Sequence, residues 1–223
     1  APFKNDQQKL MFLGKWLLSN CSNLILSDVV CQDTLSNTRL FPNRRGELCS
    51  CQQMFDPSSF HLNNKDKYLA LFESKYLPSI DICSVNEHLT LLKHLKLKQF
   101  YDIKSDELID ICELTIKESS TTGKRSLMFL LADFILDILN QNPKLIDDYS
   151  QTKRISLKQY LNITQWIPVM LERPRSYPVT LTWQGSIDSR RPFVTPREVC
   201  DKSNALLVGA TALVCALELP ESF

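Results

Sequence analysis

The stretch from Leu40 to Phe60, LFPNRRGELCSCQQMFDPSSF, holds the residues of this sequence that could most readily do chemistry. Cys49 and Cys51 are separated by a single residue, and thiolates are ligands that zinc prefers. A zinc knuckle, however, spaces its cysteines by about two to four residues and needs a second Cys or His pair, which the sequence does not supply. In a strand, alternate residues share a face. We therefore expect both cysteines to pack on one face of a strand, and we expect no metal site.

Nucleophilic catalysis by Ser or Cys needs a His and a group that orients it. The chain has three histidines, and it has no G-x-S-x-G elbow. His88 and His94 lie on an expected helix at a spacing that turns them to different sides. We therefore expect no catalytic residues and no enzyme. Because a triad can assemble from distant residues, a cytosolic enzyme with a hidden Cys or His site is the alternative hypothesis.

Glycine content excludes one class of cofactor site. The five glycines stand at positions 14, 46, 123, 185 and 209, so no two lie within ten residues of each other. A G-x-G-x-x-G loop and a Walker A loop both need closely spaced glycines to approach phosphate. Binding of a nucleotide through either loop is excluded in this sequence, and we expect no cofactor.

The bulk composition is that of an ordinary globular protein, with 43% hydrophobic and 23% charged residues in 223. A net charge of +1 gives no reason to expect nucleic acid as a partner. Eight cysteines in a chain of this length fit a reducing compartment better than a small disulfide scaffold, so we expect a cytoplasmic protein. The longest uncharged apolar run, Ala205 to Leu217, is shorter than the roughly 20 residues of a membrane span. The start, APFKNDQQKL, does not read as a signal peptide, and we expect it to be the cut edge of a longer chain.

Apolar periodicity predicts helices over most of the chain. Residues 10–18 suit a helix, residues 24–35 suit a helix or a strand, and residues 40–55 suit a short hairpin that Asp56-Pro57 ends. Four further helices are expected, capped by Asn64, by a Ser84–Glu87 capping box and by Ser105, with the last over residues 124–140.

In the last third of the chain, apolar and polar residues alternate and prolines are frequent. This pattern predicts small β elements between residues 163 and 183. Val179, Leu181 and Trp183 alternate with threonines, and a helix over Ala205 to Leu217 closes the chain. The prediction is a mainly α fold with small β-hairpin elements (α+β), forming a single compact helical domain over 1–223 with a possible loop boundary at 119–124. Trp166 and Trp183 belong to an aromatic, proline-rich segment that could bind partners, and we favour internal packing for it.

Five ordered blocks resemble the internal repeats of the sacsin family of giant modular chaperone-like proteins. They agree with the family pattern from about residue 24 to 215. The blocks are Leu40-Phe41-Pro42 with Gly46, Leu48 and Met54 to Pro57; Leu92 to Lys98; Trp166 to Val169; Arg173-Pro174, Tyr177-Pro178, Leu181 and Trp183; and Pro196, Val199 and Leu207-Val208-Gly209. The chain departs from the pattern at Lys96, where the family often has Gly, and at Thr182, where it has Pro.

The resemblance implies the segment that follows the Hsp90-like ATPase module of a repeat. It also implies a non-catalytic structural and protein-interaction module of a sacsin-type co-chaperone, acting in protein folding and quality control. Its partners would be client proteins and other domains of the same long chain, including the Hsp90-like ATPase module. Hsp70 would be engaged through a J domain outside these residues.

Overall fold

The computed structural model describes residues 2–72, 75–168 and 193–196. The strand expected around Val179 to Trp183 and the helix expected over Ala205 to Leu217 lie outside the described residues. Internal contacts divide the chain into two compact units, residues 1–103 and residues 104–223. Each unit is described by itself below.

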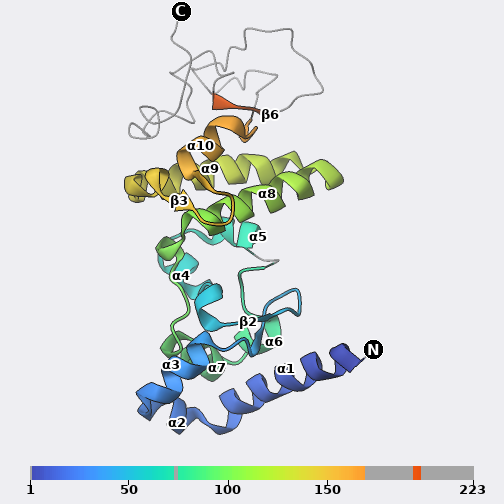
Figure 1. The fold of residues 1–223 in the computed structure, drawn as a ribbon, viewed down its shortest axis with the longest axis vertical. Helices are drawn as coiled ribbons and strands as arrows, with labels where there is room; N and C mark the ends of the chain where they lie inside the picture. Colours follow the sequence, from blue (N-terminus) through green and yellow to red (C-terminus); the bar gives the residue numbers. More distant parts are fainter. Residues whose placement is uncertain (1, 73–74, 169–192, 197–223) are drawn as a thin grey trace, which may run out of the picture. The chain divides into compact units, whose positions relative to one another are not determined.

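The first unit is built from short helices around one hairpin (Figure 1). Its elements are α1 (Pro2–Asn20), α2 (Ser22–Ser27), α3 (Val29–Asn37), β1 (Phe41–Pro42), β2 (Leu48–Cys49), η1 (Cys51–Gln53), α4 (Pro57–Leu62), η2 (Asp66–Tyr68), α5 (Leu69–Phe72), α6 (Ile80–Cys83), α7 (Asn86–His94) and η3 (Phe100–Asp102).

The second unit contains the two long helices of the middle of the chain and two small strand pairs. Its described elements are α8 (Ser105–Thr122), α9 (Arg125–Gln141), η4 (Pro143–Asp147), β3 (Tyr149–Ser150), β4 (Ile155–Ser156), α10 (Leu157–Ile163), β5 (Ile167–Pro168) and β6 (Phe193–Val194).

These elements confirm the predicted fold class, which is mainly α with small β hairpins. All three strand pairs of the described residues are antiparallel: β1 with β2, β3 with β4, and β5 with β6. That residues 1–223 act as one domain stays a prediction, as does a boundary at 119–124. In the structure Ser119 to Thr122 form the last turn of α8, and Gly123 ends that helix with a φ of 69°.

The predicted hairpin is present, and a third segment runs along it. Phe41 pairs with Cys49 and Pro42 with Leu48. On the other side of β1, Arg44 N donates to Leu77 O at 3.1 Å and Ser79 N donates to Pro42 O at 2.9 Å. The hairpin is therefore held from a segment more than thirty residues away in sequence.

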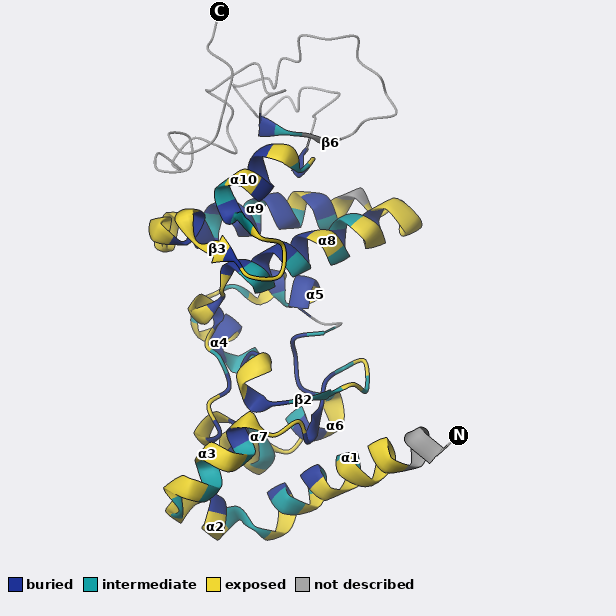
Figure 2. Ribbon diagram, in the orientation of Figure 1, coloured by how far each residue is buried: buried dark blue, intermediate teal, exposed yellow. Residues whose placement is uncertain are grey.

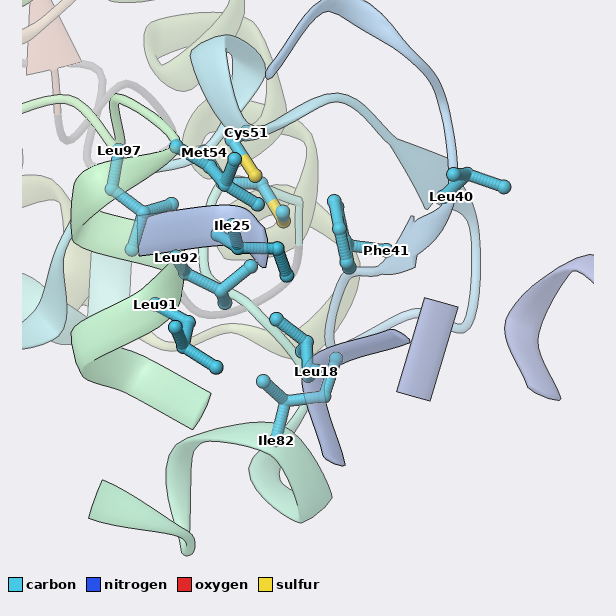
Figure 3. Close-up of a cluster of buried hydrophobic side chains, with 11 residues drawn as sticks. Leu18, Ile25, Leu40, Phe41, Cys51, Met54, Ile82, Leu91, Leu92 and Leu97 are labelled. Carbon is cyan, nitrogen blue, oxygen red and sulfur yellow. The ribbon is translucent and has the colours of Figure 1, made fainter. Parts of the chain in front are cut away.

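One apolar cluster lies between the hairpin and the surrounding helices (Figure 3). Leu18 of α1, Ile25 of α2 and Phe41 of β1 are almost fully buried in it. Its remaining members are Leu40, Cys51, Met54, Ile82, Leu91, Leu92, Leu95 and Leu97. Because these residues come from six elements, most of the first unit depends on this one cluster.

A second cluster in the same unit is aromatic. Phe72 packs edge-to-face on Phe55 and on Phe60, with ring centroids 5.1 Å and 4.9 Å apart. Phe60 makes a similar contact with Phe100 at 4.9 Å. Edge-to-face pairs of this kind place the positive ring edge against the negative face of its neighbour. Tyr68, Phe72 and Tyr76, which recur every four residues, are all less than 10% exposed.

The segment between the hairpin and α4 lies between the two clusters. Met54 belongs to the apolar cluster and the next residue, Phe55, to the aromatic one. Their backbone is tied on both sides, because Phe55 N donates to Tyr76 O and Asp56 N donates to Lys98 O, each at 2.8 Å. Lys98 N in turn donates to Met54 O at 3.0 Å.

Several predicted helix starts are wrong. Asn64 does not cap a long helix, because its φ is 55° and only η2 and the four-residue α5 follow. Ser84 is not the cap of α7, which begins after Val85 without a side-chain cap. Ser105 is the first residue of α8 and Lys104 is its N-cap. Asp56-Pro57 ends the hairpin as expected, but it also starts α4, with Asp56 as N-cap and Pro57 in the first turn.

The core of the second unit lies around α9, which packs beside α8 and also contacts η4 and β5. Eight of the 17 residues of α9 are buried. They are Met128, Leu131, Ala132, Phe134, Ile135, Leu136, Ile138 and Leu139.

Candidate functional site

Cys49 and Cys51 do not share the face of one strand, which corrects the prediction. Strand β2 ends at Cys49, and Cys51 begins the 3-10 helix η1, with Ser50 between them as the N-cap. Cys51 is fully buried in the apolar cluster, whereas Cys49 is half-buried. Both thiols are free. Across the part of the chain that the structure describes, no three His, Cys, Asp or Glu side chains are grouped so as to hold a metal ion.

Four thiols have a pKa above that of an ordinary cysteine. Burial raises the pKa of Cys51 and Cys112 strongly. Burial also raises the pKa of Cys49, with a further contribution from the Glu47 carboxylate, and that of Cys83. A raised pKa keeps a thiol protonated, and the protonated form is a poor nucleophile and a poor metal ligand.

The histidines do not come together. His88 is half-buried on α7, and its Nε2 lies 3.1 Å from Ser19 Oγ of α1. The other ring nitrogen, Nδ1, is buried and has no hydrogen-bond partner among the described residues. A Ser–His pair without a group that orients the ring lacks one part of a catalytic triad. His94 is exposed, and His61 pairs through Nδ1 with Asp66 Oδ1 at 2.5 Å.

The most concentrated polar cluster surrounds the start of α4. Asp56 is 2% exposed, and its Oδ1 accepts from Ser58 N at 2.9 Å. Lys93 Nζ lies 3.3 Å from Asp56 Oδ2 and donates to Ser58 Oγ at 2.7 Å. Ser58 Oγ itself donates to the Asp56 carboxylate, 2.8 Å from each oxygen. The arrangement is a helix cap in which the exposed Lys93 pairs with the buried Asp56.

Asn43 organises the turn of the hairpin. Its Oδ1 accepts from Arg45 N at 3.0 Å and from Glu47 N at 2.9 Å. Its Nδ2 donates to Lys75 O at 3.0 Å and to Glu47 Oε2 at 3.1 Å. The side chain of Asn43 thus holds the PNRRG turn in place through hydrogen bonds within the fold.

The aromatic, proline-rich segment is described only at its start. Trp166 is 1% exposed, and its Nε1 donates to Leu161 O at 2.9 Å. This confirms internal packing for Trp166. Residues 169–192, with Trp183, lie outside the described residues.

Large apolar side chains are exposed on the first three helices, and the sequence analysis did not foresee this. Four of them lie in α2 and at the start of α3, and we call them the α2–α3 apolar surface: Leu24, Leu26, Val29 and Val30, which are 51%, 47%, 68% and 74% exposed. Four more lie on α1, namely Leu10, Phe12, Leu13 and Trp16, and we call the last three the α1 crest. Exposed apolar side chains that gather on one region mark surfaces where proteins bind. The only signal in the sequence was that Leu10 to Leu18 is apolar on more than one side of the helix.

Within the described helices, none combines the length and the apolar character that crossing a membrane requires.

Comparison with curated proteins finds human sacsin, which is 23% identical to this chain over 207 residues. The match covers 92% of this chain and 4% of sacsin. No family model matches the chain, and no solved structure matches it. The chain is thus similar, along almost all of its length, to a small region of human sacsin.

Proposed function

We propose that this chain is a non-catalytic structural and protein-interaction module of a sacsin-type co-chaperone, acting in protein folding and quality control in the cytoplasm. The observation that carries the proposal is the similarity to human sacsin over 92% of the chain. It is supported by the order of the sequence blocks, which follows that of an internal repeat of the sacsin family. The segment would follow an Hsp90-like ATPase module.

The partners that we propose are that ATPase module, other domains of the same long polypeptide, and client proteins. Hsp70 would bind through a J domain elsewhere in the polypeptide. The α2–α3 apolar surface is the binding surface that we propose for these partners, because its four side chains are exposed at neighbouring positions. The thiols with raised pKa and the incomplete Ser19–His88 pair support a non-catalytic role.

Binding tests this proposal directly. The purified chain is expected to bind the Hsp90-like ATPase module, or to slow the aggregation of a heat-denatured client, and Leu26→Lys/Val30→Lys should weaken either effect at least tenfold. Asn23→Lys/Ser27→Lys adds the same charge to exposed polar positions of α2 and should change it less than twofold. If the unaltered chain does neither, the interaction role fails and only a spacer role is left.

The alternative, a cytosolic enzyme with a hidden Cys or His site, makes a different prediction. It requires a thiol that a soluble maleimide or iodoacetamide labels rapidly in the folded chain at neutral pH. Uniformly slow labelling of all eight cysteines is expected under the proposed function, and one thiol that reacts much faster than free cysteine would favour the enzyme.

A further inference from the structure

Helix α1 is apolar on two opposite sides. On its inner side Leu18 is 2% exposed, and Gly14 lies so close to the hairpin that an added Cβ would be 2.3 Å from Leu40 O. On its outer side the α1 crest is open: Phe12, Leu13 and Trp16 are 71%, 42% and 46% exposed. In Figure 2 exposed positions occupy most of the length of α1. A helix that is apolar on both sides is normally covered on both sides.

The order of residues along the outer side suits pairing with an identical helix. At about 100° per residue, Lys9, Phe12, Leu13 and Trp16 point to one side of α1. When two such helices pack antiparallel about a two-fold axis beside Phe12 and Leu13, Phe12 of each copy lies level with Leu13 of the other. Lys9 of each copy then lies level with Trp16 of the other. An ammonium over an indole ring is a favourable contact, and the two-fold axis repeats it.

The charges of this side are compatible with such a pair. The Lys9 side chain is 70% exposed, and its neighbour Asp6 lies 3.6 Å away on the same helix. An exposed pair of this kind contributes little, so the lysine can turn to another group. In the antiparallel arrangement neither Lys9 meets the other. The net charge of +1 also means that two copies do not repel each other strongly at long range.

We propose that α1 is a self-association helix: the α1 crest of one copy packs antiparallel on the crest of a second copy, and Lys9 of each copy covers Trp16 of the other. This interface is separate from the α2–α3 apolar surface, so it can hold or fail independently of the proposed function.

Sedimentation of the whole 223-residue chain over a concentration series tests this proposal. The unaltered chain should shift from monomer to dimer as concentration rises. Trp16→Lys should weaken dimerisation at least tenfold, because it sets Lys9 of each copy against a lysine of the other. Lys9→Glu/Trp16→Lys places opposite charges at the same positions and should recover most of the loss. Leu62→Lys removes an exposed apolar side chain of α4, outside both proposed binding surfaces, and should change dimerisation less than twofold.

Three results would overturn the proposal. The first is an unaltered chain that stays monomeric throughout the series. The second is a dimer that Trp16→Lys weakens no more than Leu62→Lys does. The third is a Lys9→Glu/Trp16→Lys variant that dimerises no better than Trp16→Lys alone, since this would rule out the antiparallel contact. Circular dichroism of each variant establishes that the helices are intact. The Lys9→Glu/Trp16→Lys variant controls for a general effect of lysine at position 16.

Discussion

At the end of α7 the backbone of Lys96 has a φ of 66°, in the left-handed region that glycine occupies most easily. Lys96 N donates to Lys93 O, and Leu97 N donates to Leu92 O at 3.2 Å, which is the hydrogen-bond pattern of a Schellman cap. The cap is therefore formed although the chain has lysine where the sacsin family often has glycine. The side chain offers partial compensation, since Lys96 Nζ lies 2.5 Å from Asp33 Oδ1.

Lys96→Gly should raise the free energy of unfolding by about 0.5–1 kcal/mol, because relief of the left-handed strain outweighs the loss of an exposed ion pair. Urea denaturation measures this change. Asp33→Asn is the matched control, since it removes the ion pair and leaves the backbone unchanged. A Lys96→Gly variant that is less stable than Asp33→Asn would contradict the assignment of strain to this residue.

Asp106, in the first turn of α8, holds the loop between β3 and β4. Its Oδ1 accepts from Thr152 Oγ1 at 2.7 Å and from Thr152 N at 3.1 Å, and Ser150 Oγ donates to the same oxygen. The side-chain hydrogen bonds from Ser150 and Thr152 lower the pKa of Asp106. A lowered pKa in the folded state means that the carboxylate stabilises the fold above the unfolded pKa of about 4. This contribution disappears as the pH falls through the folded pKa.

Asp106→Asn should therefore reduce stability at neutral pH by about 1–2 kcal/mol and matter progressively less below about pH 4. Urea midpoints of both proteins over a pH series measure the difference. Ser150→Ala, which removes one donor and keeps the carboxylate, should show a smaller effect with the same direction of pH dependence. Midpoints that differ by a constant amount at every pH would be inconsistent with this account.

At the scale of elements, α1 meets the hairpin through Gly14. A methyl group there would be 2.3 Å from Leu40 O and 3.1 Å from Leu40 C, both of them backbone atoms that cannot rotate away. Alanine is otherwise the better helix former, by roughly 1 kcal/mol. The clash and the helix propensity thus act in opposite directions at this position.

Gly14→Ala should destabilise the first unit by about 1–3 kcal/mol, because overpacking against rigid backbone exceeds the gain in helix propensity. Thermal unfolding followed by circular dichroism measures the change. Gln8→Ala on the same helix, at an exposed position, should be neutral or slightly stabilising. An equal response of the two variants would mean that α1 does not pack closely on the hairpin.

The hairpin turn depends on one side chain. Asn43 is 1% exposed, and it makes two hydrogen bonds as acceptor and two as donor. Asn43→Ala should cost roughly 2–3 kcal/mol, since it removes the four hydrogen bonds of this buried side chain. Asn43→Asp keeps the oxygen that accepts hydrogen bonds and removes the amide group that donates them. The loss of stability in this variant should therefore come only from the lost hydrogen bonds to Lys75 and Glu47. Hydrogen exchange of the amides of Arg45, Glu47 and Ser79 distinguishes the two variants. Asn43→Asp should retain the protection of the Arg45 and Glu47 amides, and Asn43→Ala should lose it.

The sequence predicted elements better than it predicted their ends. Long apolar faces, such as those of α8 and α9, bury whole turns of helix and leave a strong periodic signal. Asn64 and Ser84 have the residue types of caps, yet neither caps the helix expected after it. Both residues instead lie at the end of the helix before them, since Asn64 N donates to His61 O and Ser84 N donates to Ile80 O. Helix α4 was missed because six residues are too few to show a period.

The candidate surfaces were harder to predict than the fold. Residue types alone show that Leu24, Val30 and Trp16 are apolar, and an apolar residue in a sequence is first taken as a member of the core. Only the position of Gly14 and Leu18 against the hairpin shows which side of α1 is inward.

At the scale of the whole molecule, the chain divides into two compact units at residues 103 and 104. Asn43 lies in the first unit and Asp106 in the second, and the partners that the structure gives each of them lie in the same unit. Substitutions far apart with no shared partner usually add in their effects on stability.

Combining Asn43→Ala with Asp106→Asn should therefore give the sum of the single changes to within about 0.5 kcal/mol. Hydrogen exchange followed by mass spectrometry should further show that each substitution lowers protection within its own unit. A coupling of more than about 1 kcal/mol, or loss of protection in both units from one substitution, would favour a single cooperative domain.

The alternation of Met54 and Phe55 between two clusters constrains the number of residues as well as their identity. Deleting one residue of η1, which spans Cys51–Gln53, would bring Phe55 to the place that Met54 now occupies beside the leucines. Asp56 would then come to the place of Phe55 among the rings, where a carboxylate would be buried against apolar surface. Conservative replacement along this segment should be tolerated far more readily than any change in its length.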